Sequence, residues 1–246
     1  MTSASGSSPT FAPVAVIHRL MLRSSLGPAR VAMIAGLGAL VLAVAFAVGA
    51  SDGNSQTRVA HLVQGLGLGI VVPVVSLVFA SAVLGDHRDD STMVYLWLRP
   101  MKPSVVPLTA LAAVWSIVVP ACVVIVSAGA LAAGGDAGGV GHAALSAGAG
   151  AVAYSALFTL ASLVLGRVLI WGLAYILIWE GFVAAGAEGA ARLALRSYTI
   201  SILGAGRDVD LSLARHSLLV SLIVLGAVTV VCAVVSVRIY RRLDVA

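Results

Sequence analysis

The chain has 246 residues, of which 60% are hydrophobic and only 10% are charged, and its mean hydropathy is +1.07. Because a typical soluble domain is about 25% charged, this composition excludes a soluble globular enzyme and an intrinsically disordered protein. Two cysteines are too few for a disulfide-stapled secreted domain. The net charge of +5 comes from basic residues that flank apolar runs, which indicates a membrane protein rather than a nucleic-acid-binding protein.

Residues 1–10 are rich in Ser, Thr and Gly, which predicts a disordered tail. In the next segment, up to about residue 27, Val14, Ile17 and Met21 recur at helical spacing while basic residues occupy another face. This pattern predicts a short amphipathic helix that lies in the membrane interface. We expect residues 11–246 to form a single transmembrane domain.

Six apolar runs follow, and each is close to the length of about 20 residues that a helix needs to cross a bilayer. They lie at residues 31–50, 60–84, 104–132, 141–165, 168–186 and 216–237. The predicted fold class is therefore an all-α polytopic membrane protein with six transmembrane helices. In the second run, Gly65 and Gly69 are expected to be packing residues, because small residues four positions apart let helices approach closely.

The basic residues predict how this bundle is oriented. If the N-terminus is cytoplasmic, ten basic residues fall on the cytoplasmic side and five on the outer side, in agreement with the positive-inside rule. Six spans then leave both termini in the cytoplasm. Fourteen of the fifteen basic residues are Arg, which is typical of a GC-rich bacterial genome, so we expect the bacterial cytoplasmic membrane.

Residues 187–215, between the fifth and sixth runs, are too charged to span a membrane and too many for a tight turn. Their apolar residues predict a re-entrant or interfacial helical hairpin on the outer side. Glu180 is the one acidic residue well inside an apolar run, where a charge costs about 2.5–3.5 kcal/mol. Two interpretations stay open: a gate or transport-path contact where the hairpin meets the fifth span, or a residue near the outer interface that snorkels or pairs with Arg192 or Arg196.

Residues 85–103, between the second and third runs, hold the most informative pattern in the chain. A dense charge cluster precedes a short stretch that includes Tyr95, Leu96 and Trp97, and Pro100 ends that stretch. The pattern predicts a helix of about two turns on the cytoplasmic surface. A short helix with exposed aromatic side chains at a membrane surface is expected to dock on lipid headgroups or on a protein partner.

This segment resembles the signature of ABC-2-type permeases, the membrane subunits of many bacterial ABC exporters. That signature has an acidic residue after the second span, then Gly-Thr, paired leucines, a proline and a basic residue. The corresponding residues here are, in order, Asp86 where the family usually has Glu, Ser91-Thr92 in place of Gly-Thr, Leu96 and Leu98, Arg99-Pro100, and Lys102. In addition, Trp179-Glu180-Gly181 and Ser197-Tyr198 resemble the NosY-like branch of the family.

The resemblance implies a permease subunit that exports a substrate with energy from ATP. ATP and Mg²⁺ would bind to a separate ATPase subunit, so neither enzyme activity nor a cofactor is expected in this chain, whose sequence has no GxxxxGK[ST] loop. A second copy or a sister permease would complete the pathway, and membrane lipid is the remaining expected partner. The residues expected to contact the ATPase are Asp86, Arg88, Asp89, Thr92, Tyr95, Leu96 and Arg99.

Two alternatives belong to other classes of protein. The aspartates within residues 86–90 would suit Mg²⁺ in a prenyltransferase-like enzyme, but the one candidate for a facing acidic pair, Asp208 and Asp210, is predicted to lie on the opposite side of the membrane. An ATPase-independent, ion-coupled carrier usually has several ionisable residues within the membrane, whereas this chain offers essentially Glu180.

Overall fold

The computed structural model describes residues 18–19, 21–22, 25–85, 105–183, 193–205, 211 and 216–243. The predicted N-terminal tail and most of the predicted interfacial helix lie outside these ranges. Residues 18, 19, 21 and 22 of that helix are helical, and its position in the membrane interface stays a prediction.

All regular secondary structure in the described ranges is helical, with no strand among them. The segment from α3 to η2 is an unbroken run of helical residues in which α and π geometry alternate. The elements are α2 (Pro28–Gly49), α3 (Ser55–Leu62), η1 (Val63–Val71), α4 (Val72–Ala80), η2 (Ser81–Gly85), α7 (Val105–Ala132), α8 (Ala137–Val164), α9 (Val168–Ala174), η3 (Tyr175–Val183), α12 (Leu195–Leu203) and α13 (Leu218–Leu243), where η denotes a π-helix.

Five helices in the described part of the chain are long and apolar enough to cross a membrane. They cover Pro28–Gly49, Ser55–Val83, Val106–Ala132, Ala137–Val164 and Leu218–Arg242. The predicted fifth run coincides with a shorter apolar helix, Val168–Gly181. The structure thus confirms a helical protein with several membrane-length helices, while the count of six spans stays a prediction.

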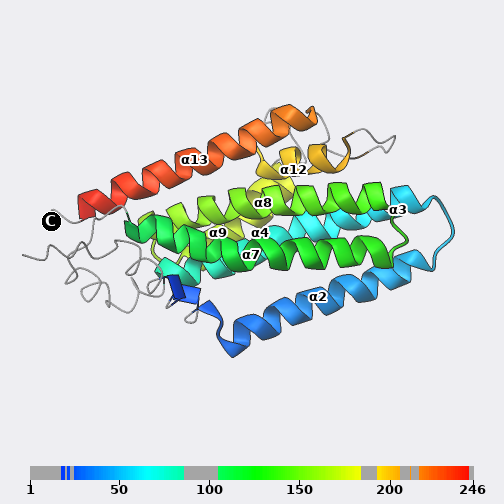
Figure 1. Ribbon diagram of the computed structural model, residues 1–246, viewed down its shortest axis with the longest axis horizontal. Coiled ribbons are helices and arrows are strands. Elements are labelled where there is room, and N and C mark those ends of the chain that lie inside the picture. Colours follow the sequence, from blue (N-terminus) through cyan, green and yellow to red (C-terminus); the bar gives the residue numbers. More distant parts are fainter. Residues whose placement is uncertain are drawn as a thin grey trace, which may run out of the picture.

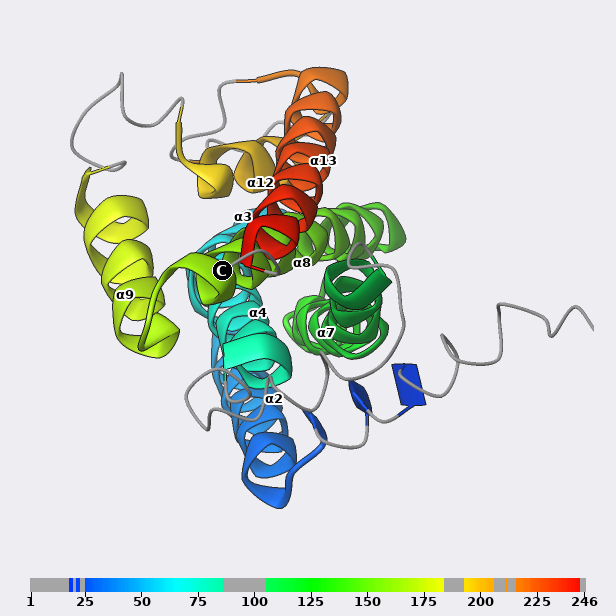
Figure 2. The ribbon, with the colours of Figure 1, turned by 90° about the vertical axis from the view of Figure 1, so that its left-hand side faces the viewer.

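Helix α8 lies at the centre of the bundle. It contacts α7, α4, α12 and α13, and in the end-on view of Figure 2 these helices surround it. Small residues make this close packing possible, since Ala143, Ala147 and Ala151 of α8 are completely buried. Gly148 also packs closely, because a Cβ added there would touch Val123 of α7 at 3.4 Å.

Helices α2 and α13 lie at the periphery, on opposite sides of the central helices (Figure 1). Only 11% of the most apolar window of α2 and 22% of that of α13 is buried, against 61% for α8. Both helices therefore present long apolar faces outwards, as expected for helices that contact lipid.

Two of the helix starts follow directly from the sequence. The Asn54 side chain accepts a hydrogen bond from the Gln56 N–H at 2.9 Å and begins α3, and Asp136 accepts from the Gly139 N–H at 3.2 Å and begins α8. These are ordinary N-caps, which satisfy helix N–H groups that have no partner within the helix. Asn54 and Asp136 lie in the α2–α3 and α7–α8 connections, and both connections are at one end of the bundle (Figure 1).

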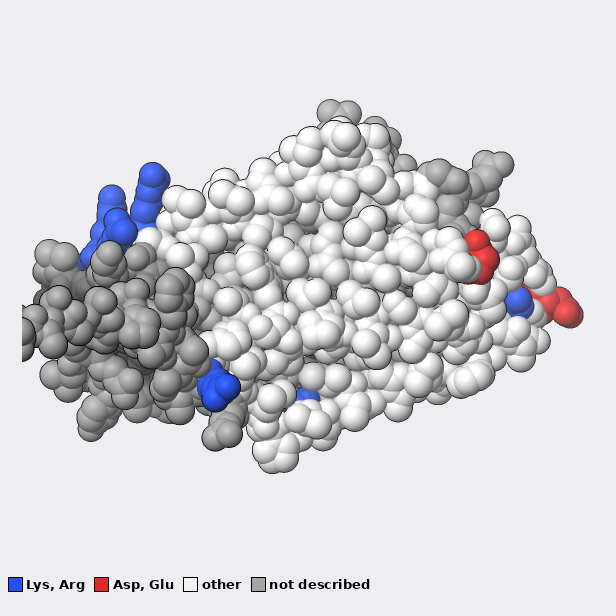
Figure 3. All heavy atoms as spheres, viewed as in Figure 1, with Lys and Arg blue, Asp and Glu red and all other residues white. Residues whose placement is uncertain are grey.

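The end of α13 lies at the other end of the bundle, where α7 also begins (Figure 1). On the face shown in Figure 3, the red atoms lie at one end, most of the blue atoms lie towards the other, and most of the middle is uncharged. A largely uncharged middle between two charged ends is the surface expected of a protein that crosses a bilayer. The described basic residues at the α13 end include Arg167, which follows α8, and Arg238, Arg241 and Arg242 of α13, and the described acidic residues at the opposite end are Asp52 and Asp136.

Candidate functional site

The predicted ATPase-contact segment is attached at the basic end of the bundle. Helix η2 ends at Gly85 and α7 begins at Val105, both at the end where α13 finishes (Figure 1). The residues between them lie outside the described ranges, so the predicted contacts stay predictions. They are Asp86, Arg88, Asp89, Thr92, Tyr95, Leu96 and Arg99.

Glu180, the other predicted site residue, lies in η3 and is almost completely buried, with 2% of its surface exposed. Its carboxylate accepts three hydrogen bonds. The Tyr175 hydroxyl donates to Oε1 at 3.0 Å, the Leu195 backbone N–H donates to Oε1 at 3.1 Å, and the Arg196 backbone N–H donates to Oε2 at 3.1 Å. One side chain therefore joins η3 to the start of α12.

The start of α12 explains why a carboxylate is needed here. The residue at its N-cap position is Ala194, whose side chain cannot accept a hydrogen bond. Glu180 supplies the missing acceptors from another element, and its negative charge lies at the positive end of the α12 dipole. An unpaired N–H in the hydrocarbon region costs several kcal/mol. Glu180 therefore provides the acceptors that an N-cap side chain normally provides, although it lies fifteen residues before Leu195 in the chain.

The π geometry of η3 helps to place Tyr175 beside Glu180. Residues five apart in an α-helix are separated by about 140° around the axis, whereas the wider turn of a π-helix pairs residue i with residue i+5. On the side of α8, Phe158 meets the Tyr175 ring edge-on at 6.2 Å and stacks on Tyr154 at 6.1 Å. The buried Tyr154 hydroxyl also lies beside the carboxylate, although it makes no hydrogen bond of ordinary geometry.

Arg196 connects α12 to the second span. Its backbone binds Glu180, while its guanidinium turns to η1, where Nη2 donates to the Gln64 carbonyl at 3.3 Å. Gly69 makes room for this contact, because a Cβ added there would lie 3.0 Å from Arg196 Nη2. The glycine predicted to pack against a helix thus packs against the tip of an arginine.

A third connection joins α12 to the beginning of α13. The His216 backbone N–H donates to Ser201 Oγ at 3.3 Å, and the rings of Tyr198 and His216 lie 4.6 Å apart. Most of α12 is buried against α8, α13 and η1. The described part of the predicted outer hairpin is therefore a short helix built into the bundle; most of the other residues of that segment lie outside the described ranges, so the hairpin stays a prediction.

These contacts bear on the two interpretations of Glu180. The carboxylate does not snorkel to the surface, and it reaches Arg196 through the backbone N–H rather than through an ion pair with the guanidinium. It lies where the fifth apolar run meets the hairpin segment, which is where a gate was predicted. The three hydrogen bonds of Glu180 hold the start of α12 in place. A role in a gate or a transport path stays a prediction.

Sequence reasoning identified Glu180 as unusual and named Arg196 as a possible partner, but it missed Tyr175 and the backbone N–H groups of Leu195 and Arg196. Leu195 and Arg196 act through backbone N–H groups, which carry no residue-specific signal. The one available hint was Ala194 in front of an apolar helical stretch that has no Ser, Thr, Asp or Asn to cap it.

The alternative prediction of a magnesium-dependent enzyme depends on residues outside the described ranges, at positions 86–90, 208 and 210. Within the described part of the chain, no group of three or more His, Cys, Asp or Glu side chains is placed to hold a metal ion. In comparison with known proteins, no family model matches the chain and no curated protein matches it.

Proposed function

We propose that this protein is the permease subunit of an ABC-2-type transporter in the bacterial cytoplasmic membrane, with six spans and both termini in the cytoplasm. A separate ATP-binding subunit supplies the energy, and a second copy or a sister permease completes an export pathway. The span that this proposal adds to the five membrane-length helices is the fifth in chain order, the helix that begins at Val168, whose apolar sequence continues to residue 186.

The observation that carries the proposal is where the segment with the permease-like sequence is attached. Both of its anchoring helices, η2 and α7, meet it at the basic end of the bundle, where Arg238, Arg241 and Arg242 also lie. By the positive-inside rule this end faces the cytoplasm. An ATPase subunit would have to dock at that end, because ATP is a cytoplasmic substrate.

The helices that anchor the segment lead directly to the bundle core. The continuous helical run from α3 to η2, residues 55–85, forms a rod that contacts α8 and α9, and α7 packs along α8. A displacement of residues 86–104 by a closing ATPase dimer would therefore move two of the helices that touch α8. We expect a rigid-body shift of these packed helices, because close-packed cores move between discrete arrangements rather than deform gradually.

Glu180 and α12 would act at the opposite end of the same pathway. Helix α12 is attached to η1 through Arg196, and η1 belongs to the rod that leads to the segment with the permease-like sequence. Movement of that rod would therefore also move α12. An outer gate is expected to be linked to the rod in this way.

The proposal is tested by purifying the tagged chain from its native membrane in mild detergent and identifying the proteins that accompany it. We expect a stoichiometric ATP-binding subunit, and we expect the double charge reversal Arg88→Glu and Asp89→Arg to abolish this association. The matched control is Asp52→Arg, a charge reversal in an exposed turn at the other end of the bundle. This control should leave the association unchanged.

Two results would contradict the proposal. One is a chain that purifies alone under conditions that preserve known transporter complexes. The other is an ATPase that stays bound to the Arg88→Glu, Asp89→Arg variant while Asp52→Arg releases it, which would place the docking surface at the wrong end of the bundle.

A further inference from the structure

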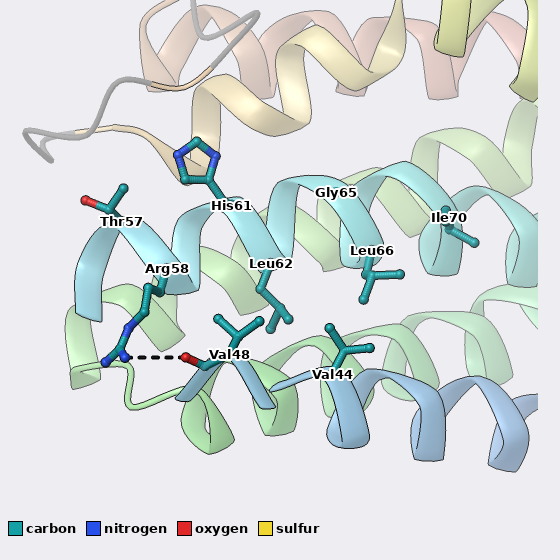
Figure 4. A pocket seen from close by; sticks show the side chains of 9 residues that line it. All are labelled: Val44, Val48, Thr57, Arg58, His61, Leu62, Gly65, Leu66 and Ile70. Carbon is teal, nitrogen blue, oxygen red and sulfur yellow. Dashed lines mark hydrogen bonds between the residues drawn. The ribbon is translucent and has the colours of Figure 1, made fainter. Parts of the chain in front are cut away.

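A groove runs between the peripheral helix α2 and the α3–η1 rod. Its volume is about 470 Å³, and most of its lining is apolar. Figure 4 shows Leu62 and Leu66 pointing across the groove towards Val44 and Val48, with Ile70 further along the rod. The groove is open to the surroundings of the bundle, so the hydrocarbon of the bilayer has direct access to it.

Gly65 forms part of this opening. It was expected to pack against a neighbouring helix, but no atom lies within 4 Å of the position that its Cβ would occupy. Gly65 is exposed on the groove side. The absence of a side chain therefore widens the groove instead of bringing two helices together.

A positive charge lies at the outer end of the groove. Arg58 Nη1 donates to the backbone carbonyls of Val48 at 3.4 Å and Gly49 at 3.2 Å, and it also donates to the carbonyl of Ser51. These acceptors are carbonyls at or just beyond the end of α2, where a cation interacts favourably with the helix dipole. All three are neutral, and the buried Arg58 Nε has no hydrogen-bond partner in the described part of the chain.

The dimensions of the groove match one leaflet of a bilayer. Ile70 follows Arg58 by twelve residues, which is at most about 18 Å along a helix. Half of a hydrocarbon core of about 30 Å is about 15 Å. A cation at the interface and an apolar channel of one leaflet's depth are the features that a single lipid molecule would fill.

We propose that this groove binds an anionic phospholipid of the outer leaflet, with one acyl chain along Val44, Leu66 and Ile70 and the phosphate against Arg58. A lipid is favoured over a protein helix because α2 is the least buried of the membrane-length helices in the described part of the chain, and its surroundings are exposed and apolar. Thr57 and His61 form the polar rim at the headgroup level. This proposal needs the chain to span a membrane with the α13 end in the cytoplasm, but it is independent of the permease function.

Photo-crosslinking in vesicles tests the proposal. The intact chain is reconstituted into vesicles of phosphatidylcholine and phosphatidylglycerol that contain a trace of either lipid with a diazirine in one acyl chain. Labelled peptides are then identified by mass spectrometry. We expect phosphatidylglycerol to label residues 44–70 about fivefold more than phosphatidylcholine does, because one arginine near the surface favours an anionic lipid by roughly that factor.

Two matched variants separate a specific site from general lipid contact. Gly65→Phe fills the groove and should remove most of the labelling at residues 44–70. Gly226→Phe is the control, because Gly226 is also an exposed helical glycine with no atom within 4 Å of its Cβ position. It should leave that labelling unchanged.

A second pair of variants tests the headgroup contact. Arg58→Gln should bring the labelling by the two lipids close to equal, whereas Arg58→Lys should retain the preference for phosphatidylglycerol. Since Arg58 also binds the end of α2, each variant is first compared with the wild type by circular dichroism. If the Arg58 variants fail to fold, the labelling of Gly65→Phe still tests the proposal.

Three results would overturn the proposal. Equal labelling of the wild-type groove by both lipids would mean that the groove has no headgroup selectivity. Unchanged labelling of Gly65→Phe would mean that the lipid lies elsewhere. Efficient disulfide formation between Val44→Cys of one copy and Leu66→Cys of another would mean that a second copy of the chain fills the groove.

Discussion

At the scale of single residues, Glu180 shows how a charge becomes favourable inside an apolar helix. A carboxylate near the middle of a span costs about 2.5–3.5 kcal/mol on insertion scales. Without it, the N–H groups of Leu195 and Arg196 and the hydroxyl of Tyr175 would lose their acceptor. Each unsatisfied buried donor costs about 1–3 kcal/mol, so three of them outweigh the cost of the charge.

This balance predicts that Glu180→Ala destabilises the start of α12 by about 3 kcal/mol or more, while Glu180→Gln costs less because its amide oxygen still accepts a hydrogen bond. Hydrogen exchange in detergent measures the effect at peptides that cover residues 193–205. Asp136→Ala is the control, because it removes an ordinary N-cap and should speed exchange only at the start of α8. Unchanged exchange at 193–205 in Glu180→Ala would show that the carboxylate does not hold α12.

At the scale of elements, the bundle consists of closely packed central helices and loosely attached peripheral ones. Helix α8 carries completely buried alanines where it meets its neighbours, whereas α13 exposes much of its apolar surface. The driving force for packing within a bilayer is van der Waals contact between small residues rather than the hydrophobic effect. The same substitution should therefore destabilise α8 and have little effect on α13.

Ala151→Leu on α8 and Ala227→Leu on α13 form a matched pair that tests this difference. Ala151 is 0% exposed, while Ala227 lies on the exposed face of α13. Overpacking should lower the free energy of unfolding of Ala151→Leu by about 1–3 kcal/mol, and Ala227→Leu should be close to neutral. Thermal unfolding in detergent measures both. Equal stability of the two variants would mean that α8 is not the packing centre of the bundle.

At the scale of the whole molecule, charge divides between the two ends of the bundle. Arg238, Arg241 and Arg242 lie at the end where α13 finishes, and Asp52 lies in the turn after α2 at the opposite end. Because cytoplasmic segments of membrane proteins carry an excess of Lys and Arg, the distribution predicts which end faces the cytoplasm.

Single introduced cysteines test this orientation in intact cells. A membrane-impermeant maleimide should label Asp52→Cys directly, and it should label Arg241→Cys only after the membrane is permeabilised. The two native cysteines, Cys122 and Cys232, are both buried, so the unmodified chain serves as the unlabelled control. Labelling of both variants from the same side would contradict the placement of the turn after α2 and the end of α13 at opposite ends of the bundle, and direct labelling of Arg241→Cys alone would reverse the orientation.

The sequence predicted most of the helices and their apolar faces, because a span of the bilayer requires about 20 apolar residues whatever the helix packs against. Over residues 168–186 the structure describes a shorter apolar helix, Val168–Gly181, and residues 184–186 lie outside the described ranges, so a span there stays a prediction. The sequence also predicted a packing role for Gly65, which instead faces an open groove. A glycine is compatible with close contact and with empty space, so the sequence alone does not distinguish them.

The sequence by itself determined the all-helical class, the membrane-length segments and the separation of charge between two ends, since these properties depend on composition along the chain and on the cost of placing polar groups in hydrocarbon. The tertiary structure alone decided that Glu180 caps α12, that Arg196 reaches Gln64 and that a groove opens beside Arg58. These contacts join segments as much as 132 residues apart and use backbone N–H and carbonyl groups. Every residue except proline carries both groups, so only the packing of the helices determines which of them meet.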